Sequence, residues 1–230
     1  MKLFLGILLG FLLTVGIAAG AAYMAFGDIG DLGERDRSQD VTRNYDFDGF
    51  REIDISGVYE VKIEVGSAAS INLSGAPEVM DRVEIAVTDG VLKLGSGNHG
   101  RTKKKLRNHG ITAIITMPEL EALDVSGVAD VEADNIAASD FDVRLSGVGE
   151  IDLSGTCDTL SARVSGVGEL DARDLECSTA DVRVSGIGEA TVYASDAVNA
   201  GVSGIGSISV YGTPDDVKKD KGLLSNISIH

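Results

Sequence analysis

The ionisable side chains recur at a regular spacing through the second half of the sequence. Residues 121 to 211 contain 17 acidic residues and four arginines. If successive periods stack as neighbouring strands, the glutamates at one position of the repeat lie one strand spacing apart and repel one another. Cations, or arginines at a neighbouring position, can compensate this charge. Each period contributes one arginine and one glutamate to two such columns: Arg144, Arg163 and Arg183, and Glu150, Glu169 and Glu189.

These charges have two interpretations. The two columns could form a mutually neutralising lattice that keeps the surface soluble, or the glutamates could hold a ladder of divalent cations. Calcium-binding repeats follow their own nine-residue pattern, which is absent here, so we favour the lattice and predict no metal site and no cofactor. The formal net charge of −16 makes nucleic acid a poor partner.

The remaining reactive residues do not indicate a catalytic site. The three histidines lie at positions 99, 109 and 230, so no serine or cysteine has an obvious general base. An Asp-Arg cluster like those of polysaccharide lyases would share one face of the protein, at Asp142, Arg144, Arg163 and Asp181. Because such residues return in successive periods, they are more typical of a lattice than of an active site. We therefore expect a protein that is not an enzyme.

One segment is strongly basic, in contrast to the acidic repeats. The run HGRTKKKLRNH at 99–109 separates two expected strands. It is either a solvated loop or a contact to anionic lipid, lipopolysaccharide or acidic glycan. Its cationic residues are Arg101, Lys103, Lys104, Lys105 and Arg107.

The two cysteines occupy the same position in adjacent periods. Cys157 and Cys177 each lie eight residues before the next repeat serine, a position filled by Ala138 and Ser195 in the flanking periods. In-register residues on parallel strands are slightly too far apart for relaxed disulfide geometry. We therefore expect a column of small residues, with a disulfide only if the two cysteines lie at a bend.

The repeat itself predicts the fold. Its serines, Ser126, Ser146, Ser165, Ser185 and Ser203, are separated by 20, 19, 20 and 18 residues. A fixed period of this size is typical of a solenoid. Apolar residues alternate with polar ones on both sides of each Ser-Gly pair, which indicates two or three short strands in each period and no helix.

Units this short must stack to bury their apolar positions, each strand pairing in parallel with its counterpart one coil away. We expect the column Leu145, Val164, Val184 and Val202 to point inward. The paired glycines of the SGVGE motif would form corners whose backbone angles other residues resist. The predicted fold is all-β, a parallel β-helix with about 18–20 residues per coil, preceded by an N-terminal apolar helix.

The N-terminal segment directs the chain out of the cytoplasm. After Met1-Lys2, residues 3–26 form 24 mostly apolar residues without a charge, long enough to span a bilayer. Ala19-Gly20-Ala21 also fits a signal peptidase site, so the segment is a membrane anchor or a cleaved signal peptide. We expect a periplasmic or cell-surface protein, either secreted or anchored in the inner membrane by residues 3–26.

Composition and patterning divide the chain into four parts. Residues 1–26 are the signal peptide or anchor, and the charged, aperiodic residues 27–46 are a linker. Residues 47–120 form an irregular β part that caps the first regular coil. Residues 121–230 form the regular coils and the C-terminal end.

Several phrases resemble the bacterial GIN-domain family, described as adhesin heads of autotransporters. They extend over residues 47–230: ISGVYEVKIEVG, DGVLKL followed by a basic stretch, TMPELEALDVSG, the SGVGE repeats and SVYGTPDDV. The resemblance implies a right-handed parallel β-helix similar to pectin-lyase-like proteins without their catalytic residues. It also implies a role in cell adhesion.

We therefore expect a non-enzymatic binding or adhesion module of the cell envelope. Its partners would be the membrane, through the N-terminal segment, and a glycan or surface protein, through the exposed ladders. One alternative is a structural envelope protein that self-associates as a homo-oligomer. A second alternative is a polysaccharide-active enzyme on a lyase-like scaffold.

Overall fold

The computed structural model describes residues 39–96 and 110–230 of the chain. Residues 39–230 form one compact unit. Both the expected N-terminal helix at 3–26 and the basic segment at 101–107 lie outside the described residues. Within the described ranges, no helix is long and apolar enough to cross a membrane.

Strands make up nearly all of the described chain, together with the short helix α2 (Pro77–Met80). The strands are β1 (Val41–Tyr45), β2 (Glu52–Ser56), β3 (Val58–Val65), β4 (Ser70–Gly75), β5 (Val83–Thr88), β6 (Val91–Ser96), β7 (Ile111–Met117), β8 (Ala122–Val125), β9 (Val128–Leu145), β10 (Val148–Val164), β11 (Val167–Val184), β12 (Ile187–Val202), β13 (Ile205–Tyr211), β14 (Asp216–Lys221) and β15 (Ser225–Ile229).

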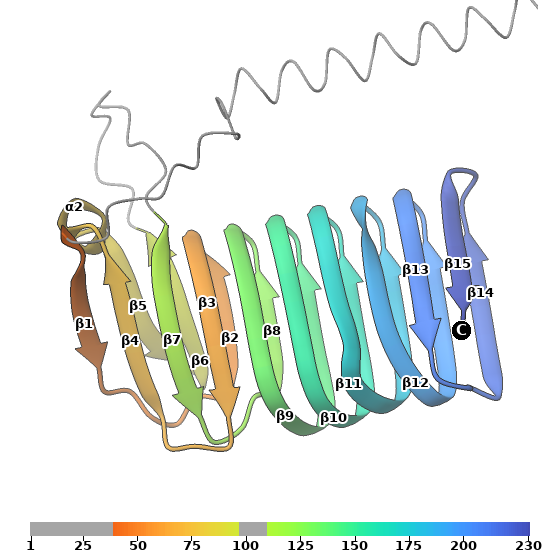
Figure 1. The fold of residues 1–230 in the computed structure, drawn as a ribbon, viewed down its shortest axis with the longest axis horizontal. Helices are drawn as coiled ribbons and strands as arrows, with labels where there is room; N and C mark the ends of the chain where they lie inside the picture. Colours follow the sequence, from red (N-terminus) through yellow and green to blue (C-terminus); the bar gives the residue numbers. More distant parts are fainter. Residues whose placement is uncertain (1–38, 97–109) are drawn as a thin grey trace, which may run out of the picture. The chain divides into compact units, whose positions relative to one another are not determined.

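The repeats form a β-solenoid in which one long strand makes almost one complete coil. Figure 1 shows β9, β10, β11 and β12 running along the front of the molecule, bending, and returning along the back. Each pairs in parallel with the next, and their residues meet in register from coil to coil. The prediction of parallel stacked strands with a period of about 20 residues is confirmed.

The strands lie in two layers (Figure 1). The front layer follows the order β1-β4-β7-β3, continues through the first halves of β9 to β12, and ends at β13 and β15. The back layer follows β5-β6-β2-β8, continues through the second halves of β9 to β12, and ends at β14. In the described part of the chain the antiparallel pairs are β1-β4, β4-β7 and β5-β6, all at the N-terminal end of the layers.

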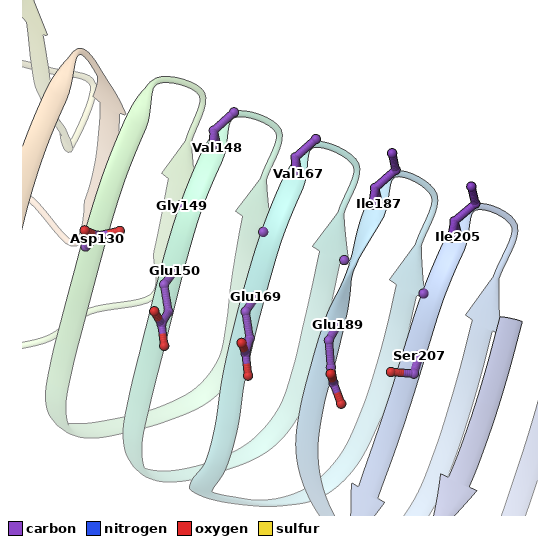
Figure 2. A pocket seen from close by; sticks show the side chains of 13 residues that line it. Asp130, Val148, Gly149, Glu150, Val167, Glu169, Ile187, Glu189, Ile205 and Ser207 are labelled. Carbon is purple, nitrogen blue, oxygen red and sulfur yellow. The ribbon is translucent and has the colours of Figure 1, made fainter. Parts of the chain in front are cut away.

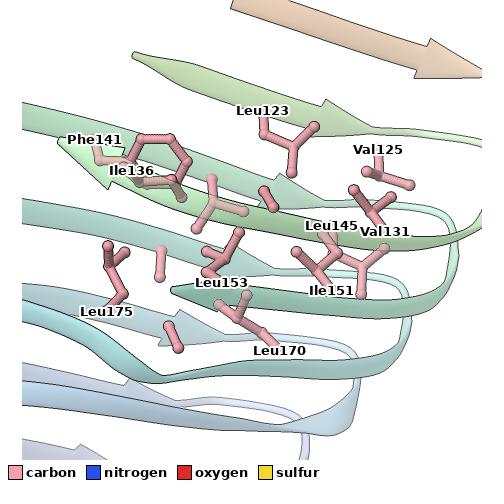
Figure 3. Close-up of a cluster of buried hydrophobic side chains, with 14 of the residues drawn as sticks. Leu123, Val125, Val131, Ile136, Phe141, Leu145, Ile151, Leu153, Leu170 and Leu175 are labelled. Atoms are coloured by element: carbon pink, nitrogen blue, oxygen red, sulfur yellow. The ribbon is translucent and has the colours of Figure 1, made fainter. Parts of the chain in front are cut away.

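A continuous apolar core fills the space between the layers. The predicted inward column Leu145, Val164, Val184 and Val202 is at most 3% exposed. Figure 3 shows side chains of both layers, such as Ile151 of β10 and Leu145 of β9, meeting in the interior. Alternation of apolar and polar residues therefore assigned the buried side of these strands correctly.

Glycines permit the close stacking of coils rather than special corner angles. A Cβ atom added at Gly166 would overlap the carbonyl oxygen of Gly147 in the preceding coil, and one added at Gly186 would overlap that of Gly166. Neither glycine has a positive φ, whereas Gly149, the second glycine of its motif, has a φ of 151°. The expectation that backbone angles require glycine at these corners is therefore confirmed at Gly149 and wrong at Gly166 and Gly186. Their backbones approach too closely for any side chain.

The last coil presents an edge with charges in core positions. β14 pairs with the second half of β12, and this register places Lys219 over Ala200 and Lys221 over Val202. Ala200 and Val202 are buried, whereas all of β14 is exposed. Charged residues on the inward side of an edge strand oppose the addition of another strand.

We expect Val184→Asp to lower the free energy of unfolding by at least about 3 kcal/mol, because it places an unpaired carboxylate in the core. Chemical denaturation of residues 39–230 measures the effect. Val167→Asp is the matched control, because the same substitution in the same strand falls on a side chain that is 50% exposed. Equal stabilities of the two variants would contradict the inward assignment.

We expect Lys219→Val with Lys221→Val to produce self-association, because the change completes the inward apolar column at the open edge. Sedimentation velocity at several concentrations measures it. The control is Lys218→Val, which removes a charge from the other side of the same strand. A double variant that stays monomeric across the concentration range would show that these lysines do not protect the edge.

Candidate binding groove on the front layer

Exposed aliphatic residues form a continuous column on the front layer, which we call the aliphatic ridge. Each is the first residue of its strand or coil, and each is 45% to 56% exposed. They pair in register from one coil to the next: Val58, Val128, Val148, Val167, Ile187 and Ile205. Contiguous exposed apolar side chains of this kind are typical of contact surfaces.

Beside the ridge lies a column of glycines that leaves the surface without side chains. Gly149, Gly168, Gly188 and Gly206 pair in register. A Cβ atom at Gly168 would overlap the carbonyl oxygen of Gly149 below it, so this floor can contain only glycine there. Glycine is therefore a requirement of the stacking, and the backbone of these glycines lines the surface beside the aliphatic ridge.

The far side of the floor is lined by glutamates, which we call the acidic ridge. Glu150, Glu169 and Glu189 stand in register, with Asp130 before them and Ser207 after them. Figure 2 shows these side chains projecting from successive strands, with the aliphatic ridge nearer the turns. Together the two ridges and the floor line a shallow groove of about 630 Å³.

The acidic ridge carries mutually repelling charges. The pKa of Glu169 is raised, first by partial burial and then by the charges of Glu150 and Glu189. The pKa of Asp152, two residues beyond Glu150, is also raised, again by burial first and then by neighbouring carboxylates. Among the described residues, no lysine or arginine forms an ion pair with a glutamate of the ridge.

The predicted arginine column does not neutralise the glutamates, because the two columns lie on different layers. On the back layer, Arg144 and Arg163 contact the Asp142 carboxylate at 2.9 and 3.3 Å. Arg183 lies 3.3 Å from Asp181. The expected cluster of these arginines and aspartates on one face is confirmed, whereas the expected Arg-Glu compensation is wrong.

A second cavity, of about 620 Å³, lies where the β7–β8 connection meets the bends of β9 and β10. Its lining includes Glu119, Glu121 and Asp142. Arg51 pairs with Glu119 at 3.1 Å and Glu121 at 3.0 Å, so part of this acidic lining is already neutralised. Among the described residues, no group of histidines, cysteines and carboxylates is arranged to hold a metal ion.

The cysteines form a disulfide rather than the favoured unlinked column of small residues, and they do so at a bend, the condition under which a disulfide was expected. Cys157 and Cys177 are register partners, as predicted, and their Cα atoms are 4.5 Å apart. Both lie where each strand bends between the layers and close to register shifts. These shifts also make Ala194, rather than the predicted Ser195, the next member of the column.

The sequence motif indicated a corner at the apolar residue after each Ser-Gly pair, but not its role as an exposed contact residue. Its exposure could have been found from alternation, because Val148 has the same parity as Glu150 and Asp152. Ile151, between those two acids, is fully buried. The other predicted contact site, Arg101, Lys103, Lys104, Lys105 and Arg107, lies outside the described residues.

A family model described as "Putative auto-transporter adhesin, head GIN domain" matches residues 49–214. The chain belongs to the GIN-domain family. No curated protein matches it. The ridges and the groove floor lie within the matched GIN-domain region, at residues 58–207.

Three crystal structures match most of this chain, and the one from Bacteroides fragilis shares its fold. A "putative adhesin" from Bacteroides fragilis is 23% identical with a TM-score of 0.68, over 83% of this chain and 97% of that one. A "putative lipid binding protein" from Parabacteroides distasonis is 21% identical with a TM-score of 0.43, over 84% and 97%. A "putative adhesin" from Parabacteroides merdae is 17% identical with a TM-score of 0.44, over 84% and 96%.

We expect Glu169→Gln to raise the melting temperature of the GIN domain at pH 7. The raised pKa of Glu169 means that folding disfavours its charged form, so partial burial of this charge, together with repulsion by its neighbours, destabilises the protein above that pKa. As the pH falls through the raised pKa the carboxyl is protonated, and the difference should disappear below its ordinary value of 4.5. Thermal melts of the variant and the parent, at pH 7 and below pH 4.5, measure this difference in melting temperature.

The matched control is Glu176→Gln, an exposed glutamate outside the acidic ridge. A Glu169→Gln variant that melts below the parent at pH 7 would show that the glutamate column stabilises the fold.

Proposed function

We propose that this GIN domain is a non-enzymatic binding module of the cell envelope, and that it adheres through the groove on its front layer. The observation that carries the proposal is the repetition of one contact unit, an aliphatic side chain beside a carboxylate, on successive coils. The right-handed winding implied by the family resemblance is part of this proposal.

Repetition suits adhesion better than catalysis. Reaction chemistry needs a few different groups placed around one reacting atom. The groove instead offers the same pair of groups at each coil, so one long ligand can contact several copies at once. Linked weak contacts of this kind give a total affinity far above that of any single contact.

The rest of the chain would place this surface outside the cytoplasm. In this proposal residues 3–26 export the domain as a signal peptide or hold it in the inner membrane. The basic segment with Lys103, Lys104 and Lys105 would approach anionic lipid or glycan, which the acidic repeats cannot do.

Self-association is the second candidate. Leu223 and Leu224, between β14 and β15, are 103% and 67% exposed and would suit a contact between copies. Lys219 and Lys221 in the adjacent strand oppose pairing of that edge. We therefore place self-association second to adhesion.

Binding of residues 39–230 to envelope polysaccharide and to whole bacterial cells tests the proposal. We expect Val148→Ser with Val167→Ser and Ile187→Ser to reduce retention about tenfold or more, because three aliphatic contacts are lost. A second variant, Lys103→Ser with Lys104→Ser and Lys105→Ser, should reduce only the salt-sensitive part of the binding.

The matched control replaces three exposed aliphatic residues outside the groove: Ile114→Ser, Leu223→Ser and Leu224→Ser. Loss of retention in the control but not in the groove variant, together with a change in sedimentation, would favour self-association. Retention that is unchanged in all three variants would overturn the proposed groove.

A further inference from the structure

The groove has a fixed period along the solenoid and a fixed width across it. Adjacent coils are about 4.8 Å apart, so Glu150, Glu169 and Glu189 repeat at that interval. The aliphatic and acidic ridges are two residues apart along each strand, or about 6.6 Å. One glycine lies between the two ridges along each of these strands.

These dimensions select a narrow and unbranched ligand. An α-helix, about 10 Å across, is wider than the distance between the two ridges and does not fit between them. An extended peptide repeats its side chains every 6.6 Å or so, which falls out of step with the coils. The backbone groups of the floor are already paired between coils, so they offer little to a peptide backbone.

An aliphatic chain that carries amines at short intervals fits both the period and the chemistry. Two amines separated by three methylenes are joined by four single bonds, which span about 5 Å when extended. This is close to the spacing of the coils. The ammonium groups can then lie beside successive glutamates while the methylenes lie against the aliphatic ridge.

We propose that the groove binds a linear polyamine, with one ammonium group beside each of Glu150, Glu169 and Glu189 and the methylenes packed on Val148, Val167 and Ile187. The proposal rests on the proposed binding function and names a class of ligand for the same groove. It uses both ridges and the glycine floor at once.

A divalent metal ion fits the groove less well. Calcium requires six to eight oxygen ligands that converge on one point. The ridge glutamates instead stand in a line, and no metal-binding group is found among residues 39–96 and 110–230. A metal ion would also leave the aliphatic ridge without a role.

The charges of the two layers favour the front layer as the site that binds a cation. On the back layer the Asp142 carboxylate is already contacted by Arg144 and Arg163. On the front layer the described residues supply no cation to the glutamates of the ridge. A polyamine would supply the charge that relieves their repulsion.

Isothermal titration of residues 39–230 with a linear tetraamine, whose amines are three or four methylenes apart, tests the proposal at low salt. The core lies entirely within these residues, which form one compact unit, so they can be used without the N-terminal segment. We expect the triple variant Glu150→Gln, Glu169→Gln and Glu189→Gln to bind about tenfold more weakly, because three ion pairs are lost.

The matched control removes three exposed carboxylates elsewhere, with the same change in net charge: Glu84→Gln, Asp158→Asn and Glu176→Gln. It should keep affinity within about twofold. Equal weakening of the two triple variants would show a general effect of net charge and would overturn the proposal. Thermal melts verify that both variants are folded.

A second comparison tests the aliphatic ridge and the spacing. Val148→Ser with Val167→Ser and Ile187→Ser should weaken tetraamine binding several-fold, an effect that simple charge attraction does not predict. A tetraamine with eight methylenes between its amines should bind more weakly than the short-spaced one. Equal binding of the two tetraamines would overturn the proposed match between the spacing of the amines and the spacing of the coils.

Competing ligands separate this inference from the proposed function. Displacement of the tetraamine by equimolar magnesium, or preference for a hexalysine peptide, would overturn the polyamine assignment. If no tetraamine binds but the aliphatic-ridge variant still loses adhesion, the inference fails and the proposed function stands. If the tetraamine binds through the groove and that variant adheres normally, the proposed function fails instead.

Discussion

The stacking of each coil on the preceding one, at the spacing of paired strands, is the constraint on which the rest of this structure depends. Hydrogen bonds between parallel strands set that spacing, and they require the same backbone path in each coil. Where two backbones approach most closely only glycine fits, as at Gly166 and Gly168. The glycine pattern of the repeat is thus a consequence of the stacking distance.

In-register stacking also turns each surface residue into a column. A column of valines gains contact area, whereas a column of glutamates accumulates repulsion, which adds to partial burial in raising the pKa of Glu169. The back layer resolves this problem by alternating charges, because Asp142 and Asp181 lie beside the arginine column. The front layer leaves the glutamates of the acidic ridge facing solvent beside a glycine floor. This difference between the layers gives the protein two chemically distinct faces.

The ends and bends of the solenoid differ from the regular coils in how their strands pair and in which residues they contain. Antiparallel strands β1 and β5 end the two layers at the N-terminal side. At the opposite edge, Lys219 and Lys221 are exposed but stand in register with the core residues Ala200 and Val202 of the neighbouring coil. The disulfide between Cys157 and Cys177 links two coils near a bend, where the regular pairing is interrupted. Irregular features are concentrated where the repeat can no longer supply a neighbouring coil or a regular pairing.

The sequence by itself determined the solenoid, its period and its inward columns, because periodicity and alternation are local properties that stacking preserves. Val184 could be assigned to the core in this way. Tertiary structure alone decided which columns share a layer, since only five residues separate Arg144 from Glu150 but a turn within them carries the chain from one layer to the other. It also decided the disulfide and the shift from Ser195 to Ala194, because bulges at the bends change the distances and register that regular strands would have.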